Sequence, residues 1–177
     1  MNKKPLILGI ESSCDETAAS IITENDQGNP IILSNIVSSQ VDIHKEFGGV
    51  VPELASRAHQ INIIPVVEMA LKKARIKKNQ LNAIAYTRGP GLLGSLLVGS
   101  SFSKSLSMGL KIPLIEVNHM HGHILCHFID NKQNKPEFPF LGITVSGGHT
   151  QIVMVEDYFT MSEPLVSMIQ FQLFSLG

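Results

Sequence analysis

The stretch LILGIESSCDET, residues 6–17, decides the fold that the sequence predicts. Residues 6–10 form a short apolar run, which predicts a buried strand, and the polar residues from Glu11 onward predict a turn. Residues 17–23 are small and β-branched, and residues 30–40 follow the turn signal Asp-Gln-Gly-Asn, so both segments predict strands. Three successive strands joined by short turns predict an antiparallel meander at the start of the chain.

Helices and strands alternate after this meander. Pro52 lies where a helix would begin, and an apolar stripe continues from it to Ala74. Pro65 falls inside the stripe and should break or kink the helix, giving two helices or one bent helix. Residues 81–87 and 113–117 predict strands, with a helix over residues 92–110 between them and a histidine-rich helix after them. The resulting βββαβαβα order predicts an α/β lobe with the ribonuclease-H-like fold of the actin, Hsp70 and sugar-kinase group.

The second half of the chain predicts the beginning of another lobe. Residues 130–137 are polar and predict a connection between lobes. Residues 140–145 and 151–155 predict a hairpin around Ser-Gly-Gly-His, which repeats the pattern of the chain's opening. We therefore expect a complete N-terminal lobe at residues 1–130, the connection and first hairpin of a second lobe at 131–159, and a tail at 160–177 that forms one short helix or strand at most.

Composition narrows the class of protein. The chain has 177 residues, of which 44% are hydrophobic and 16% charged, as in globular proteins. Its formal net charge of -1 gives no overall electrostatic case for nucleic-acid binding. The only two cysteines, Cys14 and Cys126, lie far apart in the sequence, and no apolar stretch reaches transmembrane length. These features predict a cytoplasmic protein with no membrane association.

Four of the seven histidines lie in HMHGHILCH, residues 119–127. Each residue of a helix advances about 100°, so His119, His123 and His127 would share one face and His121 would point the opposite way. Two imidazoles one turn apart can reach a single metal ion, as in the zinc peptidases. Those peptidases place their general base, a glutamate, after the first histidine, where this chain has Met120. The residues alone leave open a metal site and an amphipathic helix with solvated or hydrogen-bonded histidines.

Three other segments contain residues suited to binding. The turn in residues 9–17 could hold a phosphate or position a cation, although an ordinary polar hairpin explains it equally well. The segment GPGLLG, residues 89–94, matches the dinucleotide pattern Gly-x-Gly-x-x-Gly, with Glu116 as the ribose acid. The opening meander, the missing N–H of Pro90 and the mid-chain position argue against that pattern, and we favour a helix N-terminus directed at an anion. The glycines after Val145 predict either close approach to a ligand or a plain hairpin turn.

Taken together, five blocks of sequence resemble the bacterial TsaD (Gcp) family, whose members were once described as O-sialoglycoprotein endopeptidases. The blocks are GIESSCDET at residues 9–17, GGVVPELASRAH at 48–59, RGPGLLGSLLVG at 88–99, NHMHGHI at 118–124 and VSGGHTQ at 145–151. They occur in the order found in the family and extend the resemblance over residues 6–159.

The resemblance implies a two-lobed, actin-like enzyme with its site in the cleft between the lobes. Enzymes of this family transfer a threonylcarbamoyl group from threonylcarbamoyl-AMP to N6 of the adenosine beside the anticodon of tRNAs that read ANN codons, and AMP leaves. The partners implied are tRNA, a TsaB-type paralogue and a TsaE-type ATPase.

The resemblance also assigns residues. It implies that His119 and His123 bind one divalent metal ion, iron or zinc, with no such role for His121 and His127. It places Thr144, Val145, Ser146, Gly147 and Gly148 in the substrate-binding segment, with a threonine at position 144 as in the bacterial branch. Asp15 and Glu16 match acidic residues near the reacting centre, and we take them as the catalytic candidates.

The departures from the family pattern are also informative. The family's third metal ligand, an aspartate near the end of a chain roughly twice this long, is absent, and residues 160–177 do not resemble the family. We therefore expect a truncated product of a frameshift or gene break, with weak metal affinity and little or no transferase activity in isolation.

Other functions rank below the transferase. A noncatalytic fragment that docks the TsaB-type paralogue is the first alternative, although the pair His119 and His123 argues against the chain being that paralogue itself. A metallopeptidase comes next, disfavoured by Met120. The histidine pair and the VSGGHTQ block exclude a sugar kinase.

Overall fold

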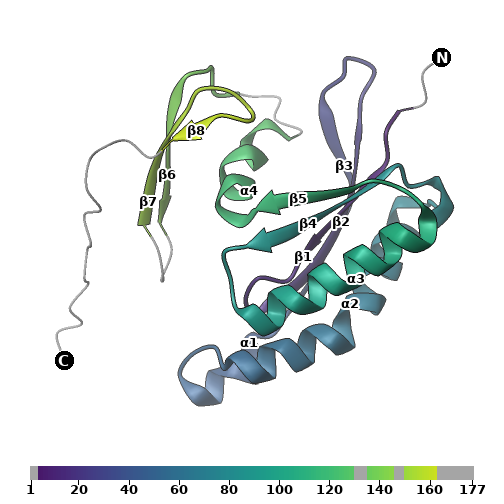
Figure 1. Ribbon diagram of the computed structural model, residues 1–177, viewed down its shortest axis with the longest axis vertical. Helices are drawn as coiled ribbons and strands as arrows, with labels where there is room; N and C mark the ends of the chain where they lie inside the picture. Colours follow the sequence, from purple (N-terminus) through teal and green to yellow (C-terminus); the bar gives the residue numbers. More distant parts are fainter. Residues whose placement is uncertain (1–3, 130–134, 146–149, 163–177) are drawn as a thin grey trace. The chain divides into compact units, whose positions relative to one another are not determined.

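Figure 1 shows the computed structural model, which describes residues 4–129, 135–145 and 150–162. The chain divides into two units with separate cores, one ending at His119 and the other beginning at Met120. The lobe boundary at residue 130 expected from the sequence stays a prediction.

The first unit is built on a five-stranded sheet with strand order β3-β2-β1-β4-β5. Strands β1 (Ile7–Glu11), β2 (Glu16–Glu24) and β3 (Pro30–Ser39) are antiparallel neighbours. Strands β4 (Ala83–Gly89) and β5 (Leu114–Asn118) extend the sheet parallel to β1. The predicted meander and the two later predicted strands are confirmed, and the structure shows that these two strands run parallel to β1.

Helix α2 is one continuous helix from Pro52 to Ala74, so of the two alternatives expected at Pro65, a break into two helices is excluded and a single helix remains. Pro65 has no backbone N–H, so the helix lacks one hydrogen bond at this position. Pro65 itself is exposed, while Ile63 and Val66 beside it are buried in the core, and their packing maintains the helix there. The other helical segments are α1 (Val41–His44), α3 (Leu93–Leu110), α4 (His119–Leu125) and three 3-10 turns, Lys45–Phe47, Lys78–Gln80 and Cys126–Phe128.

The core of the first unit lies between the sheet and helices α2 and α3, which run side by side in Figure 1. Leu8 pairs with Ile21 on one neighbouring strand and with Ile84 on the other, and none of the three side chains is exposed to solvent. Burial of each such side chain contributes roughly 1.5–3 kcal/mol. The apolar run that opens the chain therefore lies at the centre of the sheet. The same core positions the ends of the sheet's strands.

The second unit contains a three-stranded antiparallel sheet with strand order β6-β7-β8. Its strands are β6 (Phe140–Val145), β7 (Thr150–Val155) and β8 (Met161–Ser162). Ile124 of α4 packs with Val153 and Val155, and Gly142 allows the close approach of Ile124, since a Cβ there would lie 3.2 Å from the Ile124 side chain. The predicted hairpin strands are confirmed, while residues 146–149 between them lie outside the described residues.

The order of elements in the first unit identifies the fold class. Three antiparallel strands are followed by a helix, a parallel strand, a second helix and another parallel strand that leads into α4. This is the predicted ribonuclease-H-like, actin-like α/β arrangement. The antiparallel opening excludes the doubly wound dinucleotide fold, whose sheet is mostly parallel. Among the described residues, no helix is long and apolar enough to span a membrane.

Candidate functional site

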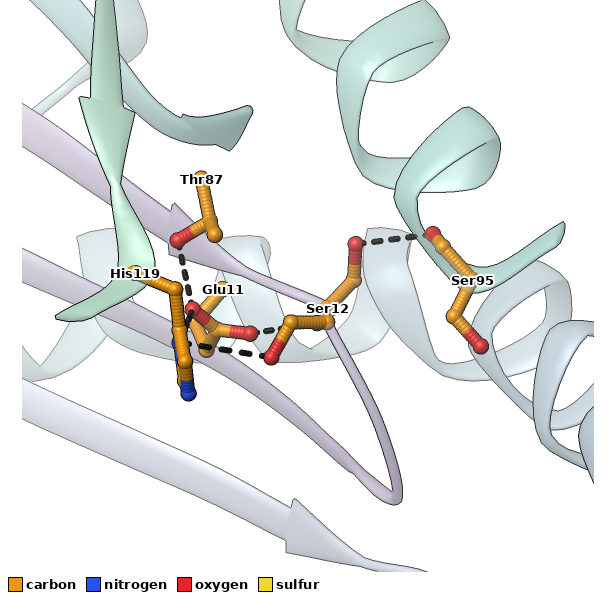
Figure 2. A network of polar contacts seen from close by, with 6 residues as sticks. Glu11, Ser12, Thr87, Ser95 and His119 are labelled. Atoms are coloured by element: carbon orange, nitrogen blue, oxygen red, sulfur yellow. Dashed lines mark hydrogen bonds and ion pairs between the residues drawn. The ribbon is translucent and has the colours of Figure 1, made fainter. Parts of the chain in front are cut away.

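The ends of three parallel strands meet at one edge of the first unit's sheet. Glu11 ends β1, Thr87 lies near the end of β4, and His119 directly follows β5. Because β1, β4 and β5 are parallel, their carboxyl ends lie at the same edge, which is where open α/β sheets bind ligands. Figure 2 shows the side chains gathered there.

Glu11 is the centre of this group of side chains. Its Oε1 accepts a hydrogen bond from the backbone N–H of Ser13, and its Oε2 accepts one from the hydroxyl of Thr87. The same Oε2 lies 3.2 Å from Nδ1 of His119, and the hydroxyl oxygen of Ser13 lies 3.3 Å from that nitrogen. The carboxylate thus connects the first residue of α4 to strands β1 and β4.

The contacts of Glu11 and His119 shift both pKa values. Burial alone would raise the pKa of Glu11, but hydrogen bonds from His119, Ser13 and Thr87 outweigh it and lower the pKa to about 2. The hydrogen bond to Glu11 raises the pKa of His119 against the opposing effect of burial. Glu11 is therefore an ionised acceptor at neutral pH, and the imidazole beside it is more basic than an ordinary histidine.

The turn after β1 is held by the N-terminal part of α3. The hydroxyl of Ser12 donates to the carbonyl of Ser95 at 2.9 Å, as Figure 2 shows, and the backbone N–H of Leu92 donates to the carbonyl of Ser13 at 2.8 Å. Ser12 and Ser13 are both buried. The turn that carries Asp15 is therefore fixed from two sides, by the sheet and by α3.

The glycines of the RGPGLLGSLLVG block allow this packing. A Cβ on Gly91 would lie 2.6 Å from the carbonyl oxygen of Ser13, and a Cβ on Gly99 would lie 2.2 Å from the hydroxyl oxygen of Ser12. Side chains at these positions would therefore collide with the turn. These glycines therefore allow α3 and the segment before it to approach the chain's own β1–β2 turn closely.

His59 of α2 holds the same turn, and sequence reasoning missed it. Its Nε2 lies 2.9 Å from the carbonyl oxygen of Cys14, and its Nδ1 lies 2.7 Å from the hydroxyl oxygen of Thr17. A carbonyl only accepts, so Nε2–H donates to Cys14. Burial lowers the pKa of the ring, so at neutral pH it is uncharged and Nδ1 accepts from the hydroxyl of Thr17. The signal available in the sequence was its spacing of four residues from Ala55 and from Ile63, which places it on the buried face of α2.

The buried position of His59 predicts a pH dependence of stability. Burial lowers the pKa of His59, against the opposing hydrogen bond to the Cys14 carbonyl. As the pH falls below about 6.5, the unfolded chain takes up a proton at this ring more readily than the native chain, so the free energy of unfolding should fall. The slope for one proton is at most about 1.4 kcal/mol per pH unit. Urea unfolding at several pH values should show a shallower slope for His59→Gln, and an equal slope in the two proteins would contradict this origin.

The two predicted catalytic residues lie in and just after this turn. Asp15 is half-buried and its carbonyl accepts the backbone N–H of Gln40 at 2.9 Å. Glu16 is exposed at the first position of β2. The structure places both near the strand end that carries Glu11, and their catalytic role stays a prediction.

The predicted metal ligands His119 and His123 lie one turn apart on α4. The α-helix ends at Leu125, so His127 lies in the following 3-10 turn and does not extend an α-helical face of three histidines. Within residues 4–129, 135–145 and 150–162, no three or more His, Cys, Asp or Glu side chains are grouped so that they could hold a metal ion. Imidazole nitrogens suit zinc or iron, and the two histidines would provide part of a complete ligand set.

The second unit brings residues of two predicted sites together in one pocket. The pocket has a volume of about 530 Å³, and its lining includes His123 and His127 from the helical segments and Thr144 and Val145 from β6. Thr144 is half-buried and Val145 is exposed. Three of the predicted substrate-binding residues, Ser146, Gly147 and Gly148, lie outside the described residues. A predicted metal ligand and the first two residues of the predicted substrate segment thus share one cavity.

Comparison with known proteins identifies related sequences over most of the chain. The family described as "TsaD: tRNA N6-adenosine threonylcarbamoyltransferase" matches residues 31–172, a range that extends into the tail at 160–177, contrary to the expectation that this tail does not resemble the family. A protein of that name from Riemerella anatipestifer is 63% identical over 160 residues, which are 90% of this chain and 45% of the relative. One from Porphyromonas gingivalis is 54% identical over 164 residues, 91% of this chain and 46% of the relative. The chain therefore spans about half the length of the curated relatives it matches.

A solved structure supports the fold. A Pseudomonas aeruginosa protein described as uncharacterized, with similarity to peptidase YEAZ, superposes with a TM-score of 0.51 at 12% sequence identity. The match covers 97% of this chain and 73% of that protein. At this identity the likeness concerns the fold and not the function.

Proposed function

The chain belongs to the TsaD family of tRNA N6-adenosine threonylcarbamoyltransferases, and from this premise we propose that it supplies part of such an enzyme. The reaction proposed is transfer of the threonylcarbamoyl group from threonylcarbamoyl-AMP to N6 of the adenosine beside the anticodon in tRNAs that read ANN codons. The observation that carries the proposal is the pocket of the second unit, where His123 and Thr144 line one cavity. His123 belongs to the NHMHGHI block, and Thr144 directly precedes the VSGGHTQ block.

The proposed chemistry distributes tasks among the chain's own residues. His119 and His123 would hold a divalent metal ion, iron or zinc, which when bound acts as a Lewis acid toward the oxygens of the acyl-adenylate. Thr144 and the following residues would bind that substrate. Asp15 and Glu16 would accept hydrogen bonds from the attacking amine, and one of the two carboxylates would take up its proton as a general base while AMP leaves.

A groove on the first unit supports binding of a protein partner. Helices α2 and α3 border a groove of about 480 Å³ that is lined by Ile63, Leu97 and Val98 among others, and Leu97 is 55% exposed. The groove combines these apolar side chains with polar ones, among them Ser56 and Gln60, which suits a helical partner, and a TsaB-type paralogue is the one we propose. Docking without catalysis is the second candidate function, and retention of the purified paralogue on an immobilised chain would support it.

Other partners and the location follow from the proposed reaction. The proposed partners include tRNA as substrate and a TsaE-type ATPase. The net charge of -1 indicates that the rest of the enzyme or its partners supply much of the contact with tRNA phosphates. A cytoplasmic location is proposed with the reaction, and Cys14 and Cys126 are free thiols, as expected in a reducing compartment.

The test of the proposed function uses a chimera, because the chain spans less than half of the relatives. Residues 6–159 would replace the corresponding segment of the Riemerella anatipestifer relative, and the purified chimera would be given threonylcarbamoyl-AMP, tRNA and the partner proteins. We expect labelled threonylcarbamoyl groups on tRNA at a rate close to that of the parent relative. The isolated chain should give little or no transfer.

Two outcomes would contradict the proposal. A folded chimera that transfers no label, while the parent relative does so under the same conditions, would show that these residues do not form a working part of the enzyme. Cleavage of peptide substrates by the chimera, abolished by His119→Asn, would instead favour the metallopeptidase.

A further inference from the structure

Three hydrogen-bond donors of the first unit converge on the carboxylate of Glu11. They are the backbone N–H of Ser13, the hydroxyl of Thr87 and the ring nitrogen Nδ1 of His119, which lies 3.2 Å from Oε2. These donors come from the turn after β1, from β4 and from the first residue of α4. A carboxylate held from three directions has a defined orientation, and it therefore fixes the direction of the imidazole that bonds to it.

The contact with Glu11 determines which nitrogen of His119 carries a proton. An ionised carboxylate only accepts hydrogen bonds, so Nδ1–H is the donor. The hydroxyl oxygen of Ser13, 3.3 Å from Nδ1, can accept from the same N–H. In the neutral ring the lone pair is then on Nε2, the nitrogen able to ligate a cation. Figure 2 shows Nδ1 of His119 turned toward Glu11 and the other ring nitrogen at the far end of the imidazole.

We propose that Glu11 is a positioning residue that orients His119 as a metal ligand, with Nε2 directed to the cation. The inference rests on the metal site of the proposed function. In metal sites a carboxylate behind the imidazole fixes the tautomer and the ring orientation and makes the nitrogen a better ligand. Loss of such a partner typically weakens metal binding about 10- to 100-fold, and this is the effect expected for Glu11.

The competing explanation is that Glu11 and His119 form an ion pair that only stabilises the fold. An ion pair of that kind changes the free energy of unfolding and leaves the metal affinity of the folded chain unchanged. The tautomer of His119 and the metal affinity are therefore the two measurements that separate a positioning residue from a structural one.

The first test is a zinc titration of the full 177-residue chain in competition with a chromogenic chelator. Glu11→Gln removes the charge and keeps the size of the side chain. Glu116→Gln is the matched control, because it removes a carboxylate of β5 that is hydrogen-bonded to Tyr86 and paired with Arg88. We expect zinc affinity to fall about 10-fold or more in Glu11→Gln and to be unchanged in Glu116→Gln.

The possible outcomes separate this inference from the proposed function. Equal zinc affinity in the unaltered chain and in Glu11→Gln overturns the role of Glu11 and leaves the metal site standing. Failure of both the unaltered chain and the chimera to bind zinc, or binding that persists in His119→Asn, removes the proposed metal site and this inference with it.

The second test needs no metal. Proton–nitrogen correlation spectra of the histidine side chains, recorded above the titration of the ring, should show His119 as the Nδ1–H tautomer in the unaltered chain. Glu11→Ala should shift the ring toward the Nε2–H tautomer. If Glu11→Ala does not fold, the unaltered chain still decides the question, because an Nε2–H tautomer there overturns the inference.

Discussion

Gly91→Ala should lower the free energy of unfolding of the first unit by about 2–4 kcal/mol. The new methyl group would lie 2.6 Å from the carbonyl oxygen of Ser13 and 2.8 Å from its Cβ. Both atoms belong to a buried residue of the β1–β2 turn, so the backbone must move apart to make room. That movement would also break the hydrogen bond from the N–H of Leu92 to the Ser13 carbonyl. Urea unfolding followed by circular dichroism measures the loss.

Gly49→Ala is the matched control for this prediction. Gly49 also lies in a loop, and a Cβ at that position meets no atom within 4 Å. An alanine there should change the free energy of unfolding by less than about 1 kcal/mol, and restriction of the unfolded chain would make that change stabilising. Equal effects of the two substitutions would show that α3 does not pack on the turn as described.

His119→Asn and His123→Asn should each reduce threonylcarbamoyl transfer by the chimera at least about 100-fold. Each substitution removes an imidazole that we propose as a metal ligand, and asparagine oxygens are poor ligands for zinc or iron. The loss should be in kcat/KM, together with a loss of bound metal. Metal content of the purified proteins and initial rates of tRNA labelling provide the two measurements.

His121→Asn is the control in the same helix. His121 lies between the two proposed ligands in α4, and in an α-helix it points away from the face that His119 and His123 share. Transfer by His121→Asn should stay within about 3-fold of the unaltered chimera, because a substitution away from the ligands usually changes stability by no more than about 0.5 kcal/mol. A comparable loss in all three variants would mean that the histidines act through stability of α4 and not as ligands.

The strands and helices of the first unit were predictable because each has a local signal. The apolar run before Glu11, the β-branched segment after it and the helical stripe beginning at Pro52 depend only on neighbouring residues. Pro65 shows the limit of local rules, since the packing of Ile63 and Val66 on the sheet maintains a helix that the proline alone would interrupt.

The candidate site was predictable only in its residue types. The blocks of sequence pointed to His119 and to the turn that contains Asp15, but nothing local connects His119 to Glu11. That contact exists because β1 and β5 are both parallel to β4, so that residues far apart in the chain end at the same edge of the sheet. The role of Gly91 has the same origin, because its neighbour Ser13 becomes apparent only after the sheet and α3 have packed.

The most direct test of the proposed function is the threonylcarbamoyl-adenosine content of tRNA in living cells. A bacterial strain depleted of its own enzyme would carry the chimera of residues 6–159 with the Riemerella anatipestifer relative, and its tRNA nucleosides would be measured by mass spectrometry. We expect modified adenosine at the level given by the parent relative, and its near absence when His119 or His123 is replaced by asparagine. Two results would contradict this expectation. One is a folded, expressed chimera in cells whose tRNA lacks the modification, and the other is tRNA that stays modified when either histidine is replaced.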